Sequence, residues 1–270
     1  MLIFVHAVSG SESGALIAGL PLRLRPAKVR SAFRRRRFEF ELSRIPMTNA
    51  GSPIHLGTRY GGWMVPEAII RSGWICYSVG VGGDVSFDAE LIERFGVRVR
   101  SFDPVQHFVE FAAEQMRHEP RFSVTRAAVA DSDGPLLMQR THHPGARAVS
   151  AAGLFDTTDP WEEFPGRSLP SLMSEFGDRQ VDLLKMDTEG TEYDLLPSLD
   201  LRALGIKVLA VCLHHNKSVG RARKLVGDLL SQGYEPVAIC PAVKITFVDR
   251  DAVAPLRVAG EPAAGQHDRS

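Results

Sequence analysis

The chain has 270 residues, of which 44% are hydrophobic and 24% are charged. This composition is typical of a globular protein with one sizeable core, and it excludes collagen-like, coiled-coil and largely disordered proteins. Lys and Arg (32) balance Asp and Glu (32), so no global charge predicts a nucleic-acid partner. Cys76, Cys212 and Cys240 are too few and too scattered for a disulfide framework or a CxxC zinc site. They favour a reducing, cytoplasmic location.

The first 50 residues carry most of the basic excess, with nine Lys or Arg against three Asp or Glu. They predict a basic extension, partly helical or disordered, ahead of a domain over residues 51–250. An anionic partner (RNA, a membrane surface or an acidic protein) is one interpretation, and a solvated extension is the favoured one. Residues 251–270, rich in Pro, Gly and Ala, predict a tail. We expect no transmembrane helix, because the longest apolar runs are far shorter than the roughly 20 residues that a bilayer requires, and no signal peptide.

Between these ends, short apolar runs alternate with segments of helical periodicity. Residues 139–168 resemble a long loop, and residues 131–134 a turn. The alternation predicts βαβ units, and hence an α/β fold with a mostly parallel sheet and helices on both faces. The last two strands are only three residues apart, too close for a parallel crossover, so we expect an antiparallel pair there. The predicted strands are 74–79, 97–102, 122–129, 181–186, 207–213, 237–240 and 244–248, and the predicted helices are 86–95, 105–116, 169–176 and 219–232.

Ligands of such sheets bind at the carboxyl ends of the strands, and unusual residues follow two of the first strands here. The loop VGVGGD, from Val79 to Asp84, is either a tight turn or a backbone that approaches a ligand closely. Its spacing does not fit the dinucleotide fingerprint GxGxxG, since Val85 stands at the third glycine. Asp103 ends the second strand, where its carboxylate could hold a ribose diol, cap the next helix, or both. Together the two features predict nucleoside binding.

Two further strand ends carry acids and histidines. Three acids, Asp187, Glu189 and Glu192, follow strand 181–186 closely. Because crowded carboxylates repel one another, we interpret Asp187 and Glu189 as functional residues at the rim of a site. For Glu192, a functional role and a solvated surface position are equally favoured. His214 and His215 follow strand 207–213, where a histidine is either a general base or a surface residue. An Mg²⁺ ion held by the acids and a histidine is an alternative. One acidic rim does not define a coordination set, however, so we predict no metal site.

The motif VDLLKMDTEGTEYDLL (181–196), with the glycine loop and the Asp-ended second strand, resembles the FkbM family of S-adenosylmethionine-dependent methyltransferases. The resemblance spans about residues 56–250, including the lead-in LGTRYGGWMVPEAI, and implies a seven-stranded Rossmann-like sheet with an antiparallel final strand. It implies that Gly80 and Gly82 line the methionine moiety, that Asp103 holds the ribose, and that residues from Val129 to Asp131 edge the adenine. Asp187 and Glu189 would face the methyl group and its acceptor. Cys212 stands where many family members carry an acid.

We therefore expect an O-methyltransferase that uses S-adenosylmethionine and acts on a hydroxyl or carboxyl of a small molecule, glycan or lipid. The alternatives are an NAD-dependent oxidoreductase and a non-catalytic nucleoside-binding module with a basic docking arm. His214 or Asp187 would be the general base. The expected catalytic residues are Asp187, Glu189 and His214, and the expected cofactor-binding residues are Val79, Gly80, Gly82, Asp84, Asp103, Val129, Asp131 and Asp187.

Overall fold

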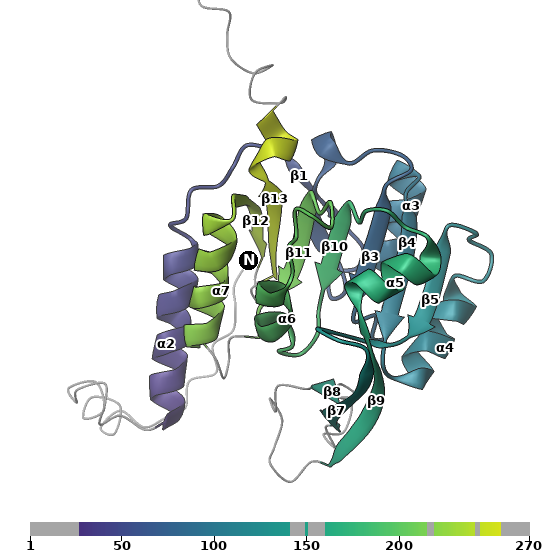
Figure 1. Ribbon diagram of the computed structural model, residues 1–270. Coiled ribbons are helices and arrows are strands. Elements are labelled where there is room, and N and C mark those ends of the chain that lie inside the picture. The colour runs from purple at the N-terminus through teal and green to yellow at the C-terminus, as the bar shows by residue number, and fades with distance from the viewer. Residues whose placement is uncertain (1–26, 141–148, 151–159, 215–218, 241–243, 255–270) are drawn as a thin grey trace, which may run out of the picture.

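A computed structural model describes residues 27–140, 149–150, 160–214, 219–240 and 244–254. Its centre is a seven-stranded sheet with the order β12-β13-β11-β10-β3-β4-β5 (Figure 1). The strands from β11 to β5 are parallel, whereas β13 is antiparallel to both β11 and β12. This confirms the predicted Rossmann-like α/β sheet with an antiparallel final strand. The bounds are β3 Ile75–Val79, β4 Arg98–Asp103, β5 Phe122–Arg126, β10 Leu183–Met186, β11 Val208–Cys212, β12 Tyr234–Cys240 and β13 Lys244–Asp249.

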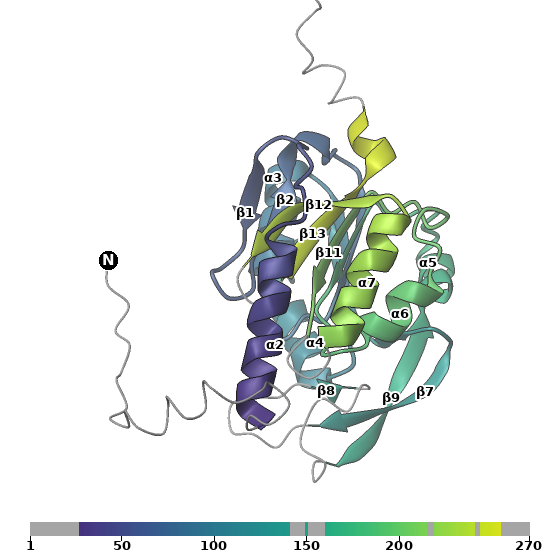
Figure 2. The same cartoon turned by 90° about the vertical axis from the view of Figure 1, so that its left-hand side faces the viewer.

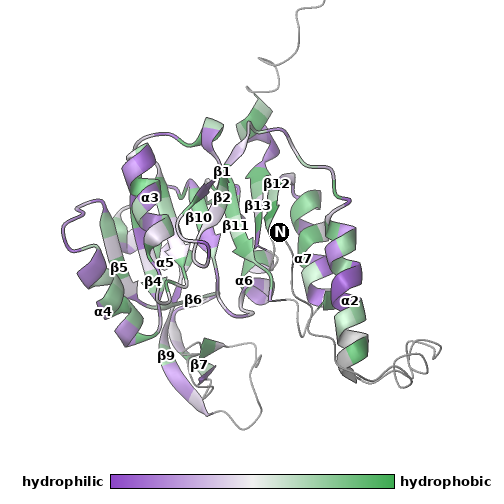
Figure 3. Cartoon of the chain, turned by 180° about the vertical axis from the view of Figure 1, so that it is seen from behind, coloured by the Kyte–Doolittle hydropathy of each residue, from purple (hydrophilic) through white to green (hydrophobic). Residues whose placement is uncertain are grey.

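Alternating side chains along the central strands separate two hydrophobic cores. Leu184 and Leu209 pack in one core, whereas their neighbours Leu183 and Val208 pack in the other. Both β10 and β11 are buried along their whole length, as parallel strands covered on both faces must be. Figure 3 accordingly shows apolar strands in the middle and mixed hydropathy on the outer helices.

Helices cover both faces of the sheet. The first core receives side chains from α2 (Ala27–Leu42), α5 (Leu169–Phe176), α6 (Glu192–Ser198) and α7 (Val219–Ser231). The second core receives them from α3 (Ser86–Phe95), and α4 (Gln106–Gln115) contacts β4 and β5. The bounds of α3 and α5 match the prediction, because each helix ends at a left-handed glycine, Gly96 or Gly177.

A second, four-stranded sheet corrects the prediction that residues 139–168 form a loop. It has the order β6-β9-β7-β8, and it lies below the main sheet in Figure 1. Its strands are β6 Ala128–Ala130, β7 Gly134–Arg140, β8 Val149–Ser150 and β9 Trp161–Ser168. The predicted strand 122–129 is likewise divided between β5 and β6, which belong to different sheets. The pattern of β9 is obscured because Pro165 and Gly166, both unfavourable in strands, lie within it.

A short hairpin and helix α6 were not predicted at all. Strands β1 (Pro53–Leu56) and β2 (Trp63–Pro66) pair antiparallel and are followed by a 3₁₀ turn, Glu67–Ile69. The hairpin packs Leu56, Trp63 and Val65 into the second core, where each is at most 2% exposed. Each strand of the hairpin contains a proline, Pro53 or Pro66, a residue that is unfavourable in strands and obscures their pattern.

Helix α2 lies within the stretch predicted as a basic extension. It runs beside α7 in both Figure 1 and Figure 2. Its Phe38 and Leu42 are 1% and 2% exposed in the first core, and Glu41 forms an ion pair with Arg223 of α7. The domain boundaries at residues 50 and 250 stay predictions, and residues 1–26 and 255–270 lie outside the described part. No helix of the described residues is long and apolar enough to cross a membrane.

Candidate functional site

A cavity of about 920 Å³ lies at the carboxyl ends of β3, β4, β10 and β11. Parallel strands bring the residues that follow them to one edge of the sheet, so segments far apart in the chain meet here, and Lys185 contacts Gly80 across a separation of 105 residues. Most of the predicted site residues line this cavity, whereas Asp131 does not, and His215 lies outside the described residues. The lining includes Val79, Gly80, Gly82, Asp84, Asp103, Val129, Asp187, Glu189 and His214.

The glycine loop after β3 needs its glycines for two different reasons. Gly80 has a φ of +81°, and a Cβ there would overlap the carbonyl oxygen of Asp187. Gly82 has a φ of +60°, and no atom lies within 4 Å of the place that its Cβ would take. Gly80 therefore allows two strand-end loops to touch, and Gly82 leaves the cavity open beside it.

Asp103 holds the glycine loop in place through its backbone. Its Oδ2 accepts hydrogen bonds from the N–H groups of Val81 and Gly82 at 3.0 Å, and its Oδ1 accepts one from Val105 at 2.9 Å. The side chain is buried, and burial raises the pKa of its carboxyl although these donors and Lys185 oppose the rise. The carboxylate thus joins the first two strand ends, and a ribose contact stays a prediction.

The other predicted cofactor residues differ in their surroundings. Asp84 accepts a hydrogen bond from the backbone N–H of Ser86, the first residue of α3, at 2.8 Å, and its second oxygen accepts from the Thr58 hydroxyl. Val129 is buried in β6 and lines the cavity, and its side chain packs in the first core. An apolar corner of the cavity lies at Phe108, which packs with Val105, Ala128 and Met138. The corner has the chemistry of a pocket for a flat, apolar ring.

Two lysines in the cavity wall were not predicted. Lys185 is 7% exposed, and its Nζ donates to the carbonyl oxygen of Gly80 from below the loop. Lys244 donates to the carbonyl oxygens of Tyr60 and Gly62, and its Nζ lies 4.6 Å from the ring centroid of Trp63. A lysine inside the apolar strand VDLLKM is a signal that could have identified Lys185.

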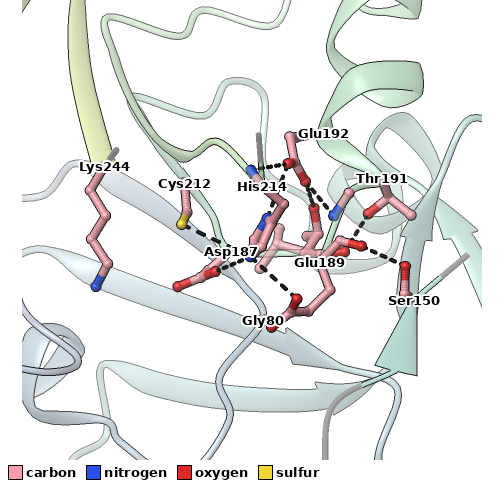
Figure 4. Close-up of polar contacts among 12 residues, drawn as sticks. Gly80, Ser150, Asp187, Glu189, Thr191, Glu192, Cys212, His214 and Lys244 are labelled. Carbon is pink, nitrogen blue, oxygen red and sulfur yellow. Dashed lines mark hydrogen bonds and ion pairs between the residues drawn. The ribbon is translucent and has the colours of Figure 1, made fainter. Parts of the chain in front are cut away.

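The acids after β10 and the histidine after β11 form one cluster (Figure 4). His214 Nε2 lies 3.5 Å from Asp187 Oδ1 and 3.4 Å from Glu189 Oε2. The Cys212 thiol lies 4.0 Å from the same nitrogen. The structure therefore brings together the three residues predicted to be catalytic, and Cys212 with them.

Glu192 fixes this cluster from behind. Its side chain is 0% exposed, and its Oε1 accepts from the His214 backbone N–H and contacts Nδ1, both at 3.1 Å. Its Oε2 accepts from the Thr188 hydroxyl and from Gly190 N. The hydrogen bonds and the charge of His214 hold the pKa of Glu192 below its usual range despite burial. Glu192 is therefore a buried anchor for His214.

Glu189 has a strained backbone. Its φ of +49° makes it the one non-glycine residue with a positive φ among the described residues. The hydroxyl of Ser150, on β8, donates to its carbonyl oxygen at 2.6 Å, so the second sheet supports this loop. Strain of this kind persists at functional sites when the surroundings fix it.

Burial and neighbouring charges act against each other in the cluster. Burial lowers the pKa of His214, but its contacts with Cys212 and Glu192 outweigh this effect, and the pKa lies well above the usual 6.5. Burial raises the pKa of Glu189, although His214 opposes the rise. An imidazole in its protonated form donates a proton and cannot accept one. The role of general base therefore stays a prediction for His214, and Asp187 and Glu189 are the other candidates for it.

Residues 83–236, more than half of the chain, match the family model described as the methyltransferase FkbM domain. No curated protein matches the chain in sequence. Among solved structures, this chain is similar to the Methanococcus jannaschii fibrillarin pre-rRNA processing protein, with 11% sequence identity and a TM-score of 0.40. The similarity covers 67% of this chain and 68% of that chain. It is also similar to a SAM-dependent methyltransferase from Aquifex aeolicus, with 15% sequence identity and a TM-score of 0.34. That similarity covers 66% of this chain and 81% of that chain.

Proposed function

Because the chain belongs to the FkbM family of S-adenosylmethionine-dependent methyltransferases, we propose that it methylates a hydroxyl or carboxyl oxygen of a small molecule, glycan or lipid. One observation carries the proposal. The cluster of Asp187, Glu189 and His214 shares one cavity with the glycine loop, so the groups that would handle an acceptor lie beside the groups that would hold the cofactor.

The cofactor would lie along the strand ends. The methionine moiety would contact the backbone at Gly80 and at Gly82, beside which the cavity is open, and the adenine would fill the apolar corner at Phe108. Asp103 would shape the loop that receives the cofactor, because it binds the two backbone N–H groups at the turn. Asp187 and Glu189 would stabilise the positive sulfonium, since opposite charges attract strongly in a partly buried site.

The reaction needs little from the protein beyond placement and one proton acceptor. The acceptor O–H gives its proton to a carboxylate, and its oxygen forms a bond to the methyl carbon. The bond from that carbon to sulfur breaks, its electron pair stays on sulfur, and S-adenosylhomocysteine leaves. We assign the proton acceptor to Asp187 or Glu189, which both border the cavity. Alignment of the reacting atoms can lower the barrier by about 7–11 kcal/mol.

Isothermal titration with S-adenosylhomocysteine tests the cofactor assignment. We expect binding at one site, and loss of binding in Gly83→Leu, because this position borders the cavity and has no atom near its Cβ. Gly227→Leu is the matched control, since Gly227 has equally open space but lies on the surface of α7. The proposal would be contradicted if the folded wild-type protein bound S-adenosylhomocysteine no more tightly than the Gly83→Leu variant does.

The acceptor is tested by following formation of S-adenosylhomocysteine with panels of hydroxylated and carboxylated compounds. Asp187→Asn is expected to lower turnover while binding of the cofactor product persists, because the amide keeps the shape but accepts no proton. Turnover equal to that of the wild-type protein would remove Asp187 from the reaction and leave Glu189.

A further inference from the structure

We propose that Asp187, Cys212 and His214 bind one divalent transition-metal ion of the Zn²⁺ type and leave its fourth position open. The three ligands lie at the carboxyl ends of the neighbouring strands β10 and β11. One ligand atom from each of Asp187, Cys212 and His214 lies within 4.8 Å of the other two. Glu189 Oε2 lies 3.4 Å from His214 Nε2, but Glu189 is outside this group of three.

The imidazole of His214 and the carboxylate of Asp187 are spaced as two ligands of one ion. His214 Nε2 is 3.5 Å from Asp187 Oδ1 and 4.0 Å from the Cys212 sulfur. Direct charge-assisted hydrogen bonds are shorter, at about 2.7–2.9 Å. Two ligands on a tetrahedral zinc, with bonds of about 2.0–2.3 Å, lie about 3.3–3.6 Å apart. The distance to Asp187 falls in this range, whereas the Cys212 sulfur, within 4.8 Å of both other ligand atoms, would have to move closer to them.

The orientation of His214 is a second, independent observation. Glu192, which is fully buried, contacts Nδ1 and so favours the tautomer that carries its proton there. A metal ion would displace the Nε2 proton of the charged ring, and the freed lone pair would face Asp187 and Cys212. A carboxylate behind the distant nitrogen of a metal-bound histidine is a recurrent arrangement in metal sites.

The charge and the softness of the cluster select the ion. Three carboxylates surround one imidazole, so even a protonated ring leaves negative charge uncompensated within the cluster. A divalent cation compensates it. The thiol of Cys212 distinguishes this set from the hard, all-oxygen sets that Mg²⁺ prefers, and a mixed Cys, His and carboxylate set suits Zn²⁺ or Co²⁺.

The ion would lie beside the place proposed for the methyl acceptor. A hydroxyl oxygen that took the open fourth position on the ion would lose its proton more readily, and Glu189 would then be the acceptor of that proton, because Asp187 would be bound to the ion. This role rests on the proposed function, whereas the site itself does not.

Cobalt titration of the full chain, stripped with a chelator and dialysed, tests the site without cofactor or acceptor. We expect one equivalent of Co²⁺ to give the visible bands of tetrahedral cobalt and a near-ultraviolet thiolate-to-cobalt band, and Zn²⁺ to abolish both. Cys212→Ser should lose the near-ultraviolet band. Cys240→Ser is the matched control, because Cys240 lines the same cavity outside the cluster, and it should keep the band.

A second measurement uses the unsubstituted protein, in case the Cys212→Ser protein does not fold. Zn²⁺ should slow alkylation of Cys212 at least tenfold and leave Cys240 unaffected, as measured by mass spectrometry of peptides. Folded protein that shows no saturable cobalt spectrum, or a near-ultraviolet band that survives in Cys212→Ser, overturns the site. The outcome is independent of S-adenosylhomocysteine binding, so failure of the metal site and failure of the proposed function can be told apart.

Discussion

Replacement of Glu192 by Gln tests whether this residue is the buried anchor of the site. The side chain accepts four contacts, two from His214 on one oxygen and one each from Thr188 and Gly190 on the other. A glutamine oxygen can serve only one of these pairs. If it serves His214, the amide can still donate to the Thr188 hydroxyl, which rotates, but the N–H of Gly190 loses its acceptor.

The cost follows from these contacts. A buried backbone N–H without an acceptor costs about 1–3 kcal/mol, and a hydrogen bond to a charged partner contributes about 1.5–3 kcal/mol that is lost with the charge. We therefore expect the free energy of unfolding to fall by about 3–5 kcal/mol. Urea denaturation measures it, as a lower midpoint with an unchanged slope. Asp194→Asn is the control, because Asp194 lies on the same helix with a side chain that is 75% exposed, and its effect should stay within about 0.5 kcal/mol. Equal midpoints for the two variants would refute the anchor role.

Three further substitutions probe the glycine loop after β3, the ion pair between Arg100 and Asp178, and helix α2. Asp103→Ala leaves three backbone N–H groups without their acceptor, so affinity for S-adenosylhomocysteine should fall at least tenfold in calorimetry; unchanged affinity would separate the loop from cofactor binding. Asp178→Ala removes the carboxylate from a side chain that is 5% exposed and leaves Arg100 unpaired, so thermal denaturation should show a loss of about 3–5 kcal/mol, and a loss below 1 kcal/mol would contradict this reasoning. Phe38→Ala should cost about 3–5 kcal/mol. The exposed Phe33→Ala should cost less than about 0.5 kcal/mol, and equal losses in the two would place α2 outside the core.

The sequence was sufficient to locate the edge of the sheet where the site lies. The run VLAVC is apolar without interruption and VDLLKM is mostly apolar, which predicts strands covered on both faces, and the polar residues after them must then gather at one edge. The same logic could not assign β9, since Pro165 and Gly166 imitate a loop. It could not assign Glu192 either. An acid in the first turn of a helix is normally exposed, and its complete burial depends on Thr188, Gly190 and His214, whose positions only the tertiary structure determines.

The left-handed backbone of Glu189 bears on how this protein responds to selection. Glycine would adopt the φ of +49° without the steric cost of about 1–2 kcal/mol that other residues pay. Replacement of Glu189 by Gly would therefore stabilise the folded protein by more than the added flexibility of glycine stabilises the unfolded chain. A library selected for stability alone should therefore enrich Gly at position 189, whereas a library selected for methyl transfer should retain Glu. The carboxylate and the relaxed backbone cannot both be present, so thermostability gained at this position would come with lost activity.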